Sequence, residues 1–355
     1  MIKYLGSKRA LVGVLGALAA ASGATTAVDL FTGSTRVAQE FKRRGLVTTA
    51  VDTASYAEVL AQCFVATDAV SVDPAEVADA LARLSALPDR RGYVTQVFCE
   101  RARYFHPANG VRIDAIRHGI DDLYPDSPLR PLLLTSLLLA ADAVDSTVGL
   151  QMAYLKQWAP RALKPLALRP PALTSGPGVA VRADAPAWVG DMAPVDLAYL
   201  DPPYNQHRYF TNYHVWETLV RWDDPPHYGV ACKRVDARDA ATRSPFNARR
   251  AMPEALAATI GAVRAAVVAV SFSAEGFVPI EEVVAMCRAR GTTVELLAFD
   301  HRRHVGSVIG VHNLRGERVG RPGPRRTTEY IVLAGPADAL AAMADAARAV
   351  QPSTR

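Results

Sequence analysis

The sequence predicts an open, doubly wound α/β sheet that is interrupted after its second strand by a mostly helical insert. Three observations carry this prediction. Short β-type runs alternate with helical patterns in residues 25–52 and again in residues 178–350. The first two runs are joined by a turn and a helix and end in an acid, as in a right-handed βαβ unit. Between the two parts, residues 55–183 have helical periodicity and few strand signals.

The composition is that of an ordinary globular protein. Its 355 residues are 50% hydrophobic and 21% charged, with 40 Lys and Arg against 35 Asp and Glu. This balance excludes a disordered or collagen-like chain, and the length suits one large domain with an insert, or two domains. No apolar run reaches the ~20 residues that a membrane helix needs, so no membrane association is expected.

The cysteines and histidines predict neither a disulfide framework nor a metal site. The four cysteines lie far apart and include no C-x-x-C pair, which favours a reducing cytoplasm as the location. His301, His304 and His312 have no acid or cysteine at a fixed spacing beside them, so they are not expected to bind a metal.

The amino-terminal part is expected to form the first βαβ unit after an opening helix. In order, the elements are a helix, a β-type run, a turn, a helix, a second run and an acid: Ala10–Ala21, Thr25–Phe31, Thr32–Ser34, a helix continuing to Arg44, Leu46–Val51 and Asp52. Lys3, Lys8 and Arg9 before the opening helix also fit a secretory signal peptide. The α/β interpretation is favoured, because the elements that follow continue such a core.

The insert is expected to be helical, with one irregular stretch. Pro74–Leu87 and Pro131–Lys156 have helical periodicity. Between them, Arg90–His118 is irregular, aromatic and basic, and the Pro-rich linker Pro160–Pro177 closes the region. At roughly 125 residues the insert has the size of a small domain.

The α/β pattern then returns with five strands and four helices. The expected strands are Gly178–Arg182, Val195–Leu200, Ala266–Phe272, Thr292–Phe299 and Thr327–Leu333. The expected helices are Tyr213–Trp222, Pro253–Arg264, Pro279–Arg290 and Pro336–Val350.

The strongest chemical signal is Asp201-Pro202-Pro203-Tyr204, which directly follows the apolar run Val195–Leu200. A polar segment at the carboxyl end of a buried strand lies where open α/β sheets bind their ligands. The prolines fix φ and stiffen the loop, Asp201 offers acceptor oxygens, and Tyr204 offers a flat face. Acceptors beside a stacking ring suit a planar group that carries an amino group. A plain turn that ends a strand is the alternative, and the chain's βαβ opening argues against it.

A second signal is the turn after the first strand. Gly33 lacks Cβ and permits close approach of a ligand, and the helix that follows favours a carboxylate at its amino end. Asp52, about twenty residues on, has the spacing of an acid that accepts hydrogen bonds from ribose hydroxyls. Taken alone, this pattern also fits a dinucleotide-binding enzyme.

Several blocks in series resemble the Dam-like adenine DNA methylases of the D12 family, which use S-adenosyl-L-methionine. The blocks are Tyr4-Leu5-Gly6-Ser7-Lys8, Asp29-Leu30-Phe31-Thr32-Gly33-Ser34, Asp52, Asp184, Asp201-Pro202-Pro203-Tyr204, Asn212-Tyr213-His214 with Glu217-Thr218, and Ser271-Phe272-Ser273-Ala274-Glu275-Gly276. They span residues 1–54 and 184–335, and no block falls in the insert. Two positions depart from the family pattern, where Ser7 and Thr35 stand in place of glycines.

The resemblance implies a Rossmann-like methyltransferase sheet that methylates the exocyclic N6 amine of adenine in double-stranded DNA after base flipping, at a short specific sequence. It implies a catalytic, cofactor-binding domain of residues 1–54 and 184–355, and an insert, 55–183, that recognises DNA. The implied catalytic residues are Asp201, Pro202, Pro203 and Tyr204. The implied S-adenosyl-L-methionine contacts are Tyr4, Lys8, Asp29, Phe31, Gly33, Ser34, Asp52, Asp184 and Asp201.

DNA contacts are expected from two arginine-rich regions. In the insert, basic residues alternate with aromatic ones, which suits groove contact, although a solvated surface over an aromatic core explains them equally well. The second region is residues 301–326, which has seven arginines against Glu317 alone. The candidate contacts are Arg90, Arg91, Arg101, Arg103, Arg112, Arg302, Arg303, Arg325 and Arg326.

Charge summed by segment agrees with this division. The overall excess is only +5, but residues 184–228 carry −5 and residues 229–330 carry +6. A basic rim beside an acidic site is the pattern expected if phosphates are bound around a carboxylate centre. The open alternatives are a methyltransferase for RNA adenine, cytosine N4 or protein glutamine, and a catalytically silent DNA-binding protein. A cognate restriction endonuclease is expected as a functional partner at most, without a stable complex.

Overall fold

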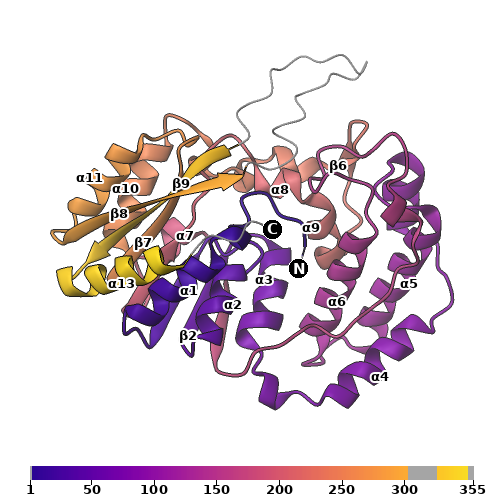
Figure 1. Cartoon of the computed structure of the whole chain (residues 1–355). Coiled ribbons are helices and arrows are strands. Elements are labelled where there is room, and N and C mark those ends of the chain that lie inside the picture. The colour runs from indigo at the N-terminus through magenta and orange to yellow at the C-terminus, as the bar shows by residue number, and fades with distance from the viewer. Residues whose placement is uncertain (1, 303–325, 351–355) are drawn as a thin grey trace. The chain divides into compact units, whose positions relative to one another are not determined.

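The computed structural model describes residues 2–302 and 326–350. Its main sheet has seven strands: β1 (Thr26–Leu30), β2 (Val47–Asp52), β3 (Gly178–Arg182), β4 (Val195–Leu200), β7 (Ala265–Ser273), β8 (Thr293–Arg302) and β9 (Arg326–Gly335). Their order is β3-β2-β1-β4-β7-β9-β8. Strand β9 runs antiparallel to both β7 and β8, whereas the β1/β4, β2/β3 and β4/β7 pairs are parallel. The predicted doubly wound α/β fold is confirmed (Figure 1).

The chain divides into two compact units. The first unit contains residues 1–7, 32–183 and 207–244, and the second contains residues 8–31, 184–206 and 245–355. The helical insert and the segment after the Asp201 loop therefore cluster in the first unit. Strands β1 and β4, between which the strand order reverses, both belong to the second.

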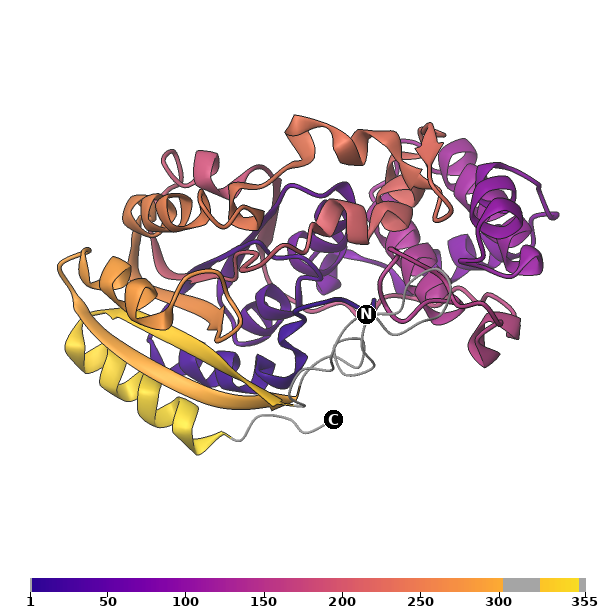
Figure 2. The ribbon, with the colours of Figure 1, turned by 90° about the horizontal axis from the view of Figure 1, so that it is seen from above.

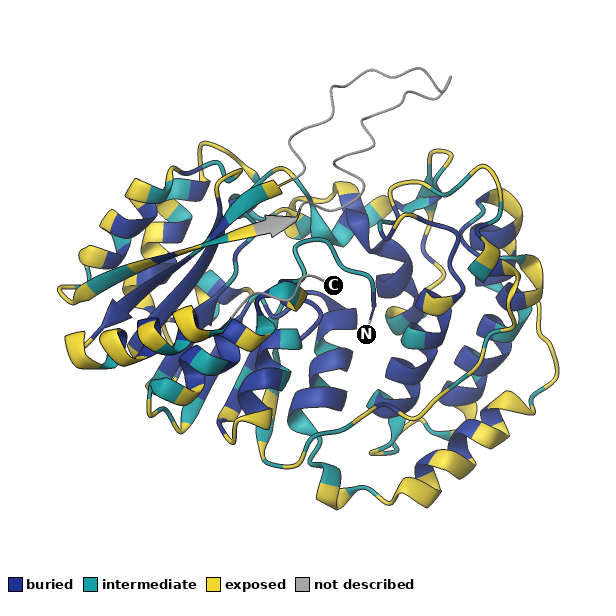
Figure 3. Cartoon of the chain, in the orientation of Figure 1, coloured by how far each residue is buried: buried dark blue, intermediate teal, exposed yellow. Residues whose placement is uncertain are grey.

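The second unit is a five-stranded sheet covered by helices. Its helices are α1 (Val12–Ala21), α7 (Ala185–Trp188), α10 (Met252–Ala262), α11 (Ile280–Arg288) and α13 (Ala337–Ala349). Helix α1 packs on α13, which lies along β8 and β9, and α10 packs on α11 (Figures 1 and 2). Strand β7 is buried over its last seven residues, as a central strand with covered faces requires (Figure 3).

The first unit is mostly helical and carries β2 and β3. Its helices are α2 (Arg36–Arg43), α3 (Ser55–Ala61), α4 (Pro74–Ser85), α5 (Pro107–Leu123), α6 (Arg130–Ala143), α8 (Tyr209–Asn212) and α9 (His214–Arg221). One hydrophobic core joins the insert to α9, because Tyr213 and Trp216 lie in the same buried cluster as Phe98 and Leu137. The predicted helical character of the insert is confirmed.

Two details of the predicted insert are wrong. The helix expected to reach Lys156 ends at Ala143. Beyond it the Thr147 hydroxyl bonds both Asp145 and the Gly149 N–H, and such local side-chain bonds compete with a helix. The stretch expected to be irregular contains the π-helical segment Val94–Arg101 and the start of α5.

The Asp114 side chain explains why part of this stretch is helical and not irregular. Its carboxylate accepts hydrogen bonds from the backbone N–H groups of Gly92, Val94 and Thr95 at 2.8–3.0 Å, and so satisfies the start of the π-helical segment. This capping acid lies about twenty residues away in the chain, so no local pattern indicated it.

All four cysteines are free and buried. Among residues 2–302 and 326–350, no helix has the length and apolar character needed to cross a bilayer.

Candidate active site

The Asp201 loop lies at the reversal point of the strand order. Strand β4 is an apolar run whose last four residues are buried, and its parallel partner β1 ends level with it, with Leu30 opposite Leu200. The Asp201 N–H donates to the Leu30 carbonyl at 3.4 Å, which continues the ladder by one residue. The loop thus leaves the sheet where parallel α/β folds bind their ligands.

Asp201 is one of two carboxylates that share a buried lysine. Lys8 Nζ lies 3.0 Å from Asp201 Oδ1 and 3.3 Å from Glu329 Oε2. The three side chains are only 5%, 18% and 7% exposed for Lys8, Asp201 and Glu329, respectively. Burial alone would lower the pKa of Lys8, but Asp201 and Glu329 raise it well above its usual value, so the lysine is charged. The cluster therefore holds two carboxylates and one ammonium.

Tyr204 is fixed by contacts on several sides. Its ring lies 5.9 Å from that of Phe272, its hydroxyl bonds Ser273, and its carbonyl accepts the Phe277 N–H at 2.8 Å. Lys8 Nζ lies 5.7 Å from the ring centroid. Burial raises the pKa of Tyr204 to about 12, so the hydroxyl is neutral. A ring held in this way has little entropy to lose when a flat group stacks on it.

The Asp201 environment predicts how activity depends on pH. Burial raises the pKa of Asp201 to about 6, although the neighbouring Lys8 opposes that shift. As the hydrogen-bond acceptor that the sequence predicts, Asp201 works only when ionised, so activity should fall as the pH is lowered through about 6, to roughly a tenth one unit below it. Single-turnover activity measured from pH 5 to 8.5, with circular dichroism at each pH to verify folding, tests this. An acid limb near pH 4 would contradict it.

The loop after β1 contains three residues with left-handed backbone angles. Phe31, Gly33 and Thr35 have φ of 67°, 52° and 62°. A Cβ on Gly33 would lie 2.8 Å from the Tyr4 ring, so only glycine fits there. Strained backbone of this kind concentrates at functional sites. Thr35, one of the two departures from the family pattern, is thus a β-branched residue at a position that favours glycine.

The Thr35 geometry predicts an unusual order of stabilities. Thr35→Gly and Thr35→Ala both remove the hydroxyl that accepts from Gln39 at 2.7 Å, but only glycine relaxes the left-handed φ. The glycine variant should be about 1 kcal/mol more stable than the alanine variant by urea unfolding. At ordinary positions alanine is the more stable of the two, so that order here would contradict the strain.

The Asp52 side chain connects the Gly33 turn to the segment that precedes α3. Its two oxygens accept the N–H groups of Gly33 at 2.8 Å and Ala54 at 3.0 Å. Burial raises its pKa, against these hydrogen bonds. In the second unit, Asp29 is buried on β1 opposite Tyr199 of β4, and burial raises the pKa of Asp184 at the start of α7. Ser34 is also buried.

Tyr4 belongs to a cluster of four tyrosines that the sequence did not predict. Its ring stacks on Tyr213 at 4.6 Å and on Tyr209 at 5.3 Å, and its hydroxyl lies 3.3 Å from that of Tyr56. Tyr213 belongs to a block quoted above, but no spacing links Tyr56 and Tyr209 to Tyr4. Ser7, the other departure from the family pattern, has a buried hydroxyl without a hydrogen-bond partner among the described residues.

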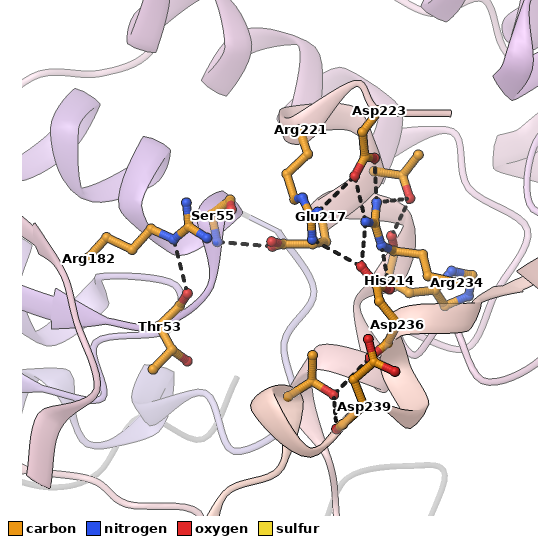
Figure 4. A network of polar contacts seen from close by, with 12 residues as sticks. Thr53, Ser55, Arg182, His214, Glu217, Arg221, Asp223, Arg234, Asp236 and Asp239 are labelled. Atoms are coloured by element: carbon orange, nitrogen blue, oxygen red, sulfur yellow. Dashed lines mark hydrogen bonds and ion pairs between the residues drawn. The ribbon is translucent and has the colours of Figure 1, made fainter. Parts of the chain in front are cut away.

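Helix α9, which follows the Asp201 loop in the chain, is tied to its surroundings by a polar network (Figure 4). Glu217 accepts the Ser55 N–H at the start of α3 at 3.0 Å. Thr218 contacts the buried Arg234, which pairs with Asp223 and Asp236. The Asn212–Thr218 block is therefore a structural anchor within the first unit.

The insert arginines that are predicted to contact DNA differ in whether their guanidinium groups already have partners within the protein. Arg112 donates to the Ser85 and Leu87 carbonyls at the end of α4 and to Asp89, so both terminal nitrogens of its guanidinium group are hydrogen-bonded within the protein. Arg91 is exposed and pairs with Glu100 at 2.7 Å. Arg90 is exposed as well.

Arg101 and Arg103 lie among aromatic rings. Arg101 is exposed, with Nη1 3.1 Å from His227 Nε2. The Arg103 guanidinium lies 4.4 Å from the centroid of the Trp158 ring. In the second arginine-rich region, Arg326 pairs with Asp300 at 2.6 Å. Arg303 and Arg325 lie outside the described residues, as does the Arg302 side chain.

Comparison with known proteins gives the family. A protein-family sequence model described as D12 class N6 adenine-specific DNA methyltransferase matches residues 4–254. The chain is 34% identical over 206 residues to "Type II methyltransferase M.NlaIII" of Neisseria lactamica, a match that covers 55% of this chain and 60% of that protein. It is 29% identical to "Type II methyltransferase M.FokI" of Planomicrobium okeanokoites, which covers 60% and 33%, respectively. It thus spans less than two thirds of either relative. The family model covers well over half of the chain, which therefore belongs to the D12 class N6 adenine-specific DNA methyltransferase family.

Proposed function

We propose that this chain transfers the methyl group of S-adenosyl-L-methionine to the exocyclic N6 amine of adenine in DNA. The observation that carries the proposal is the Asp201–Tyr204 loop at the carboxyl end of β4, with its carboxylate beside the buried Lys8 ammonium. Membership of the family supports the same substrate and cofactor. Free thiols at all four cysteines suit a reducing cytoplasm.

The residues assigned to the cofactor retain polar groups that suit it. The Asp52 carboxylate accepts backbone N–H groups of Gly33, Ala54 and Thr53, and since a carboxylate has about four lone-pair sites it can also accept from a ribose hydroxyl. The buried Ser7 hydroxyl, without a partner among the described residues, offers a further polar contact. Tyr4, Lys8, Asp29, Phe31, Gly33, Ser34 and Asp184 remain the other proposed contacts.

In the proposed reaction, Asp201 and the Pro202 carbonyl accept the two N–H bonds of the adenine amine. That amine is a poor nucleophile because its lone pair is delocalised into the ring, and the two acceptors draw the nitrogen toward tetrahedral geometry. The cofactor supplies the methyl group, whose bond to sulfur breaks with the electron pair left on sulfur. Asp201 then takes the proton that the methylated nitrogen releases. Tyr204 stacks on the base, so positioning and electrostatics do most of the catalysis.

The target atom is inaccessible within a duplex, so the base must be flipped out at a cost of a few kcal/mol. We assign DNA recognition to the insert, residues 55–183, as a domain distinct from the catalytic residues 1–54 and 184–355. Its exposed arginines are the proposed phosphate and base contacts, and binding through them should weaken as salt rises. The relatives named as type II methyltransferases support a short specific target and a restriction endonuclease as functional partner.

Methylation of mixed nucleic acid and protein with methyl-labelled cofactor tests the proposal. Label should appear in DNA as N6-methyladenine, at positions that share one short sequence. Label found only in RNA, in protein or on cytosine N4 would overturn the proposal. Cofactor binding by calorimetry without any transfer would identify a silent DNA-binding protein.

A further inference from the structure

Glu329 is the one member of the Lys8 cluster to which neither a sequence motif nor the reaction above gives a part. It stands on β9, opposite Ser273 at the end of β7 and Phe299 of β8. This position on β9, beside the last residue of β7, places the Glu329 carboxylate next to Lys8, which lies 321 residues away in the chain. A carboxylate this deeply buried is seldom retained unless it is paired.

We propose that Glu329 is a positioning residue for methyl transfer. It holds the Lys8 ammonium beside Asp201 and keeps the cluster at a net negative charge while the substrate amine becomes cationic. This inference rests on the proposed function. Among the residues that the structure describes, Lys8 is the only cation in the cluster, and because two carboxylates share it, neither is fully neutralised.

The charge matters at two moments of the reaction. As the adenine nitrogen forms its bond to carbon it gains positive charge, which a net negative site stabilises. The nitrogen then loses one proton, and Asp201 accepts it more readily when a second carboxylate is near. Burial is the main cause of the raised pKa of Asp201, and Glu329 adds to it in the direction expected from a like charge.

The other groups that face Asp201 from the described part of its unit are neutral or already counted. Tyr204 comes from the loop itself and Tyr199 from β4, and burial keeps both hydroxyls protonated. Asp29 on β1 lies opposite Tyr199 in the strand register and is not among the groups that shift the pKa of Asp201. Within the described part of this unit, Lys8 and Glu329 are therefore the charged groups that shift the pKa of Asp201.

The test compares Glu329→Gln, which removes the charge but keeps the shape, with Glu329→Asp, which keeps the charge. In Glu329→Gln, Lys8 pairs with Asp201 alone, so kcat should fall about tenfold and the acid limb of kcat should move down by about one pH unit. In Glu329→Asp the limb should stay near its wild-type position. The matched control is Glu295→Gln on β8, which removes an exposed pair with Arg348 and should leave both quantities unchanged.

If the wild type is active and the acid limb of kcat lies at the same pH in Glu329→Gln, the inference is overturned. A purely structural ion pair would change stability and leave the acid limb where it is. A wild type without transfer would instead contradict the proposed function. In that case the inference is decided by ¹³C NMR titration of the Asp201 carboxyl, assigned with Asp201→Asn. Its midpoint should be lower in Glu329→Gln than in the wild type, and equal midpoints would overturn the inference.

Discussion

Replacing Asp201 with alanine should abolish methyl transfer to DNA while the protein still folds. In the proposed reaction the carboxylate accepts a hydrogen bond from the amine as that amine gains positive charge, and removal of one such group costs about 10³-fold in rate. The fold should survive because Lys8 keeps Glu329 as its partner at 3.3 Å. Single-turnover methylation with labelled cofactor measures the rate, and circular dichroism verifies the fold.

Asp201→Asn separates geometry from charge. The amide keeps the size of the side chain and one acceptor oxygen, but it neither takes a proton nor balances Lys8. It should be nearly as inactive as Asp201→Ala, and its residual rate should no longer show an acid limb near pH 6. A residual rate with the wild-type limb would assign that limb to another group.

The same strand supplies the control. Asp196 lies near the amino end of β4 and accepts four hydrogen bonds from Thr25 and Thr26 at 2.8–3.0 Å. These bonds lower its pKa to about 2. Asp196→Asn should lower stability by about 1–2 kcal/mol and leave kcat unchanged. If Asp201→Ala methylates DNA at the wild-type rate, Asp201 has no part in the mechanism.

Local pattern predicted the elements that position the Asp201 loop. The ranges of β3 and β4 agree with the structure to the residue, because both are short apolar runs between turn signals. The Asp201 loop was found because a polar tetrapeptide ends one of these runs. Local reasoning succeeds where the information lies within about ten residues of chain.

Long-range partners explain what the sequence did not predict. Glu329 reaches Lys8 only because β9 pairs antiparallel between β7 and β8, an order that no local pattern contains. The tyrosine cluster likewise assembles Tyr4, Tyr56 and Tyr209 from three separate segments. The strain at Thr35 was visible only as a departure from a family pattern until its φ was known.

Arg234 gives the largest expected effect on stability. Its side chain is 1% exposed and makes two bonds of 2.7 Å to Asp223 and bonds of 3.0 and 2.7 Å to Asp236. Burial alone would lower the pKa of Arg234, but the two carboxylates raise it, and it lowers theirs in turn. Arg234→Ala should therefore cost about 3 kcal/mol in urea unfolding at pH 7, because it removes the buried cation that both half-buried acids share and leaves them only the more exposed Arg221.

Arg221 is the matched control, because it pairs with the same two carboxylates at 2.9 and 3.1 Å from a side chain that is 36% exposed. Arg221→Ala should cost at most about 1 kcal/mol. Acids with lowered pKa values contribute stability above their unfolded pKa of about 4 and lose it as the pH falls. The difference between wild type and Arg234→Ala should thus shrink as the pH is lowered from 7 to 3. A difference independent of pH would mean that Arg234 stabilises the first unit through packing, not through charge.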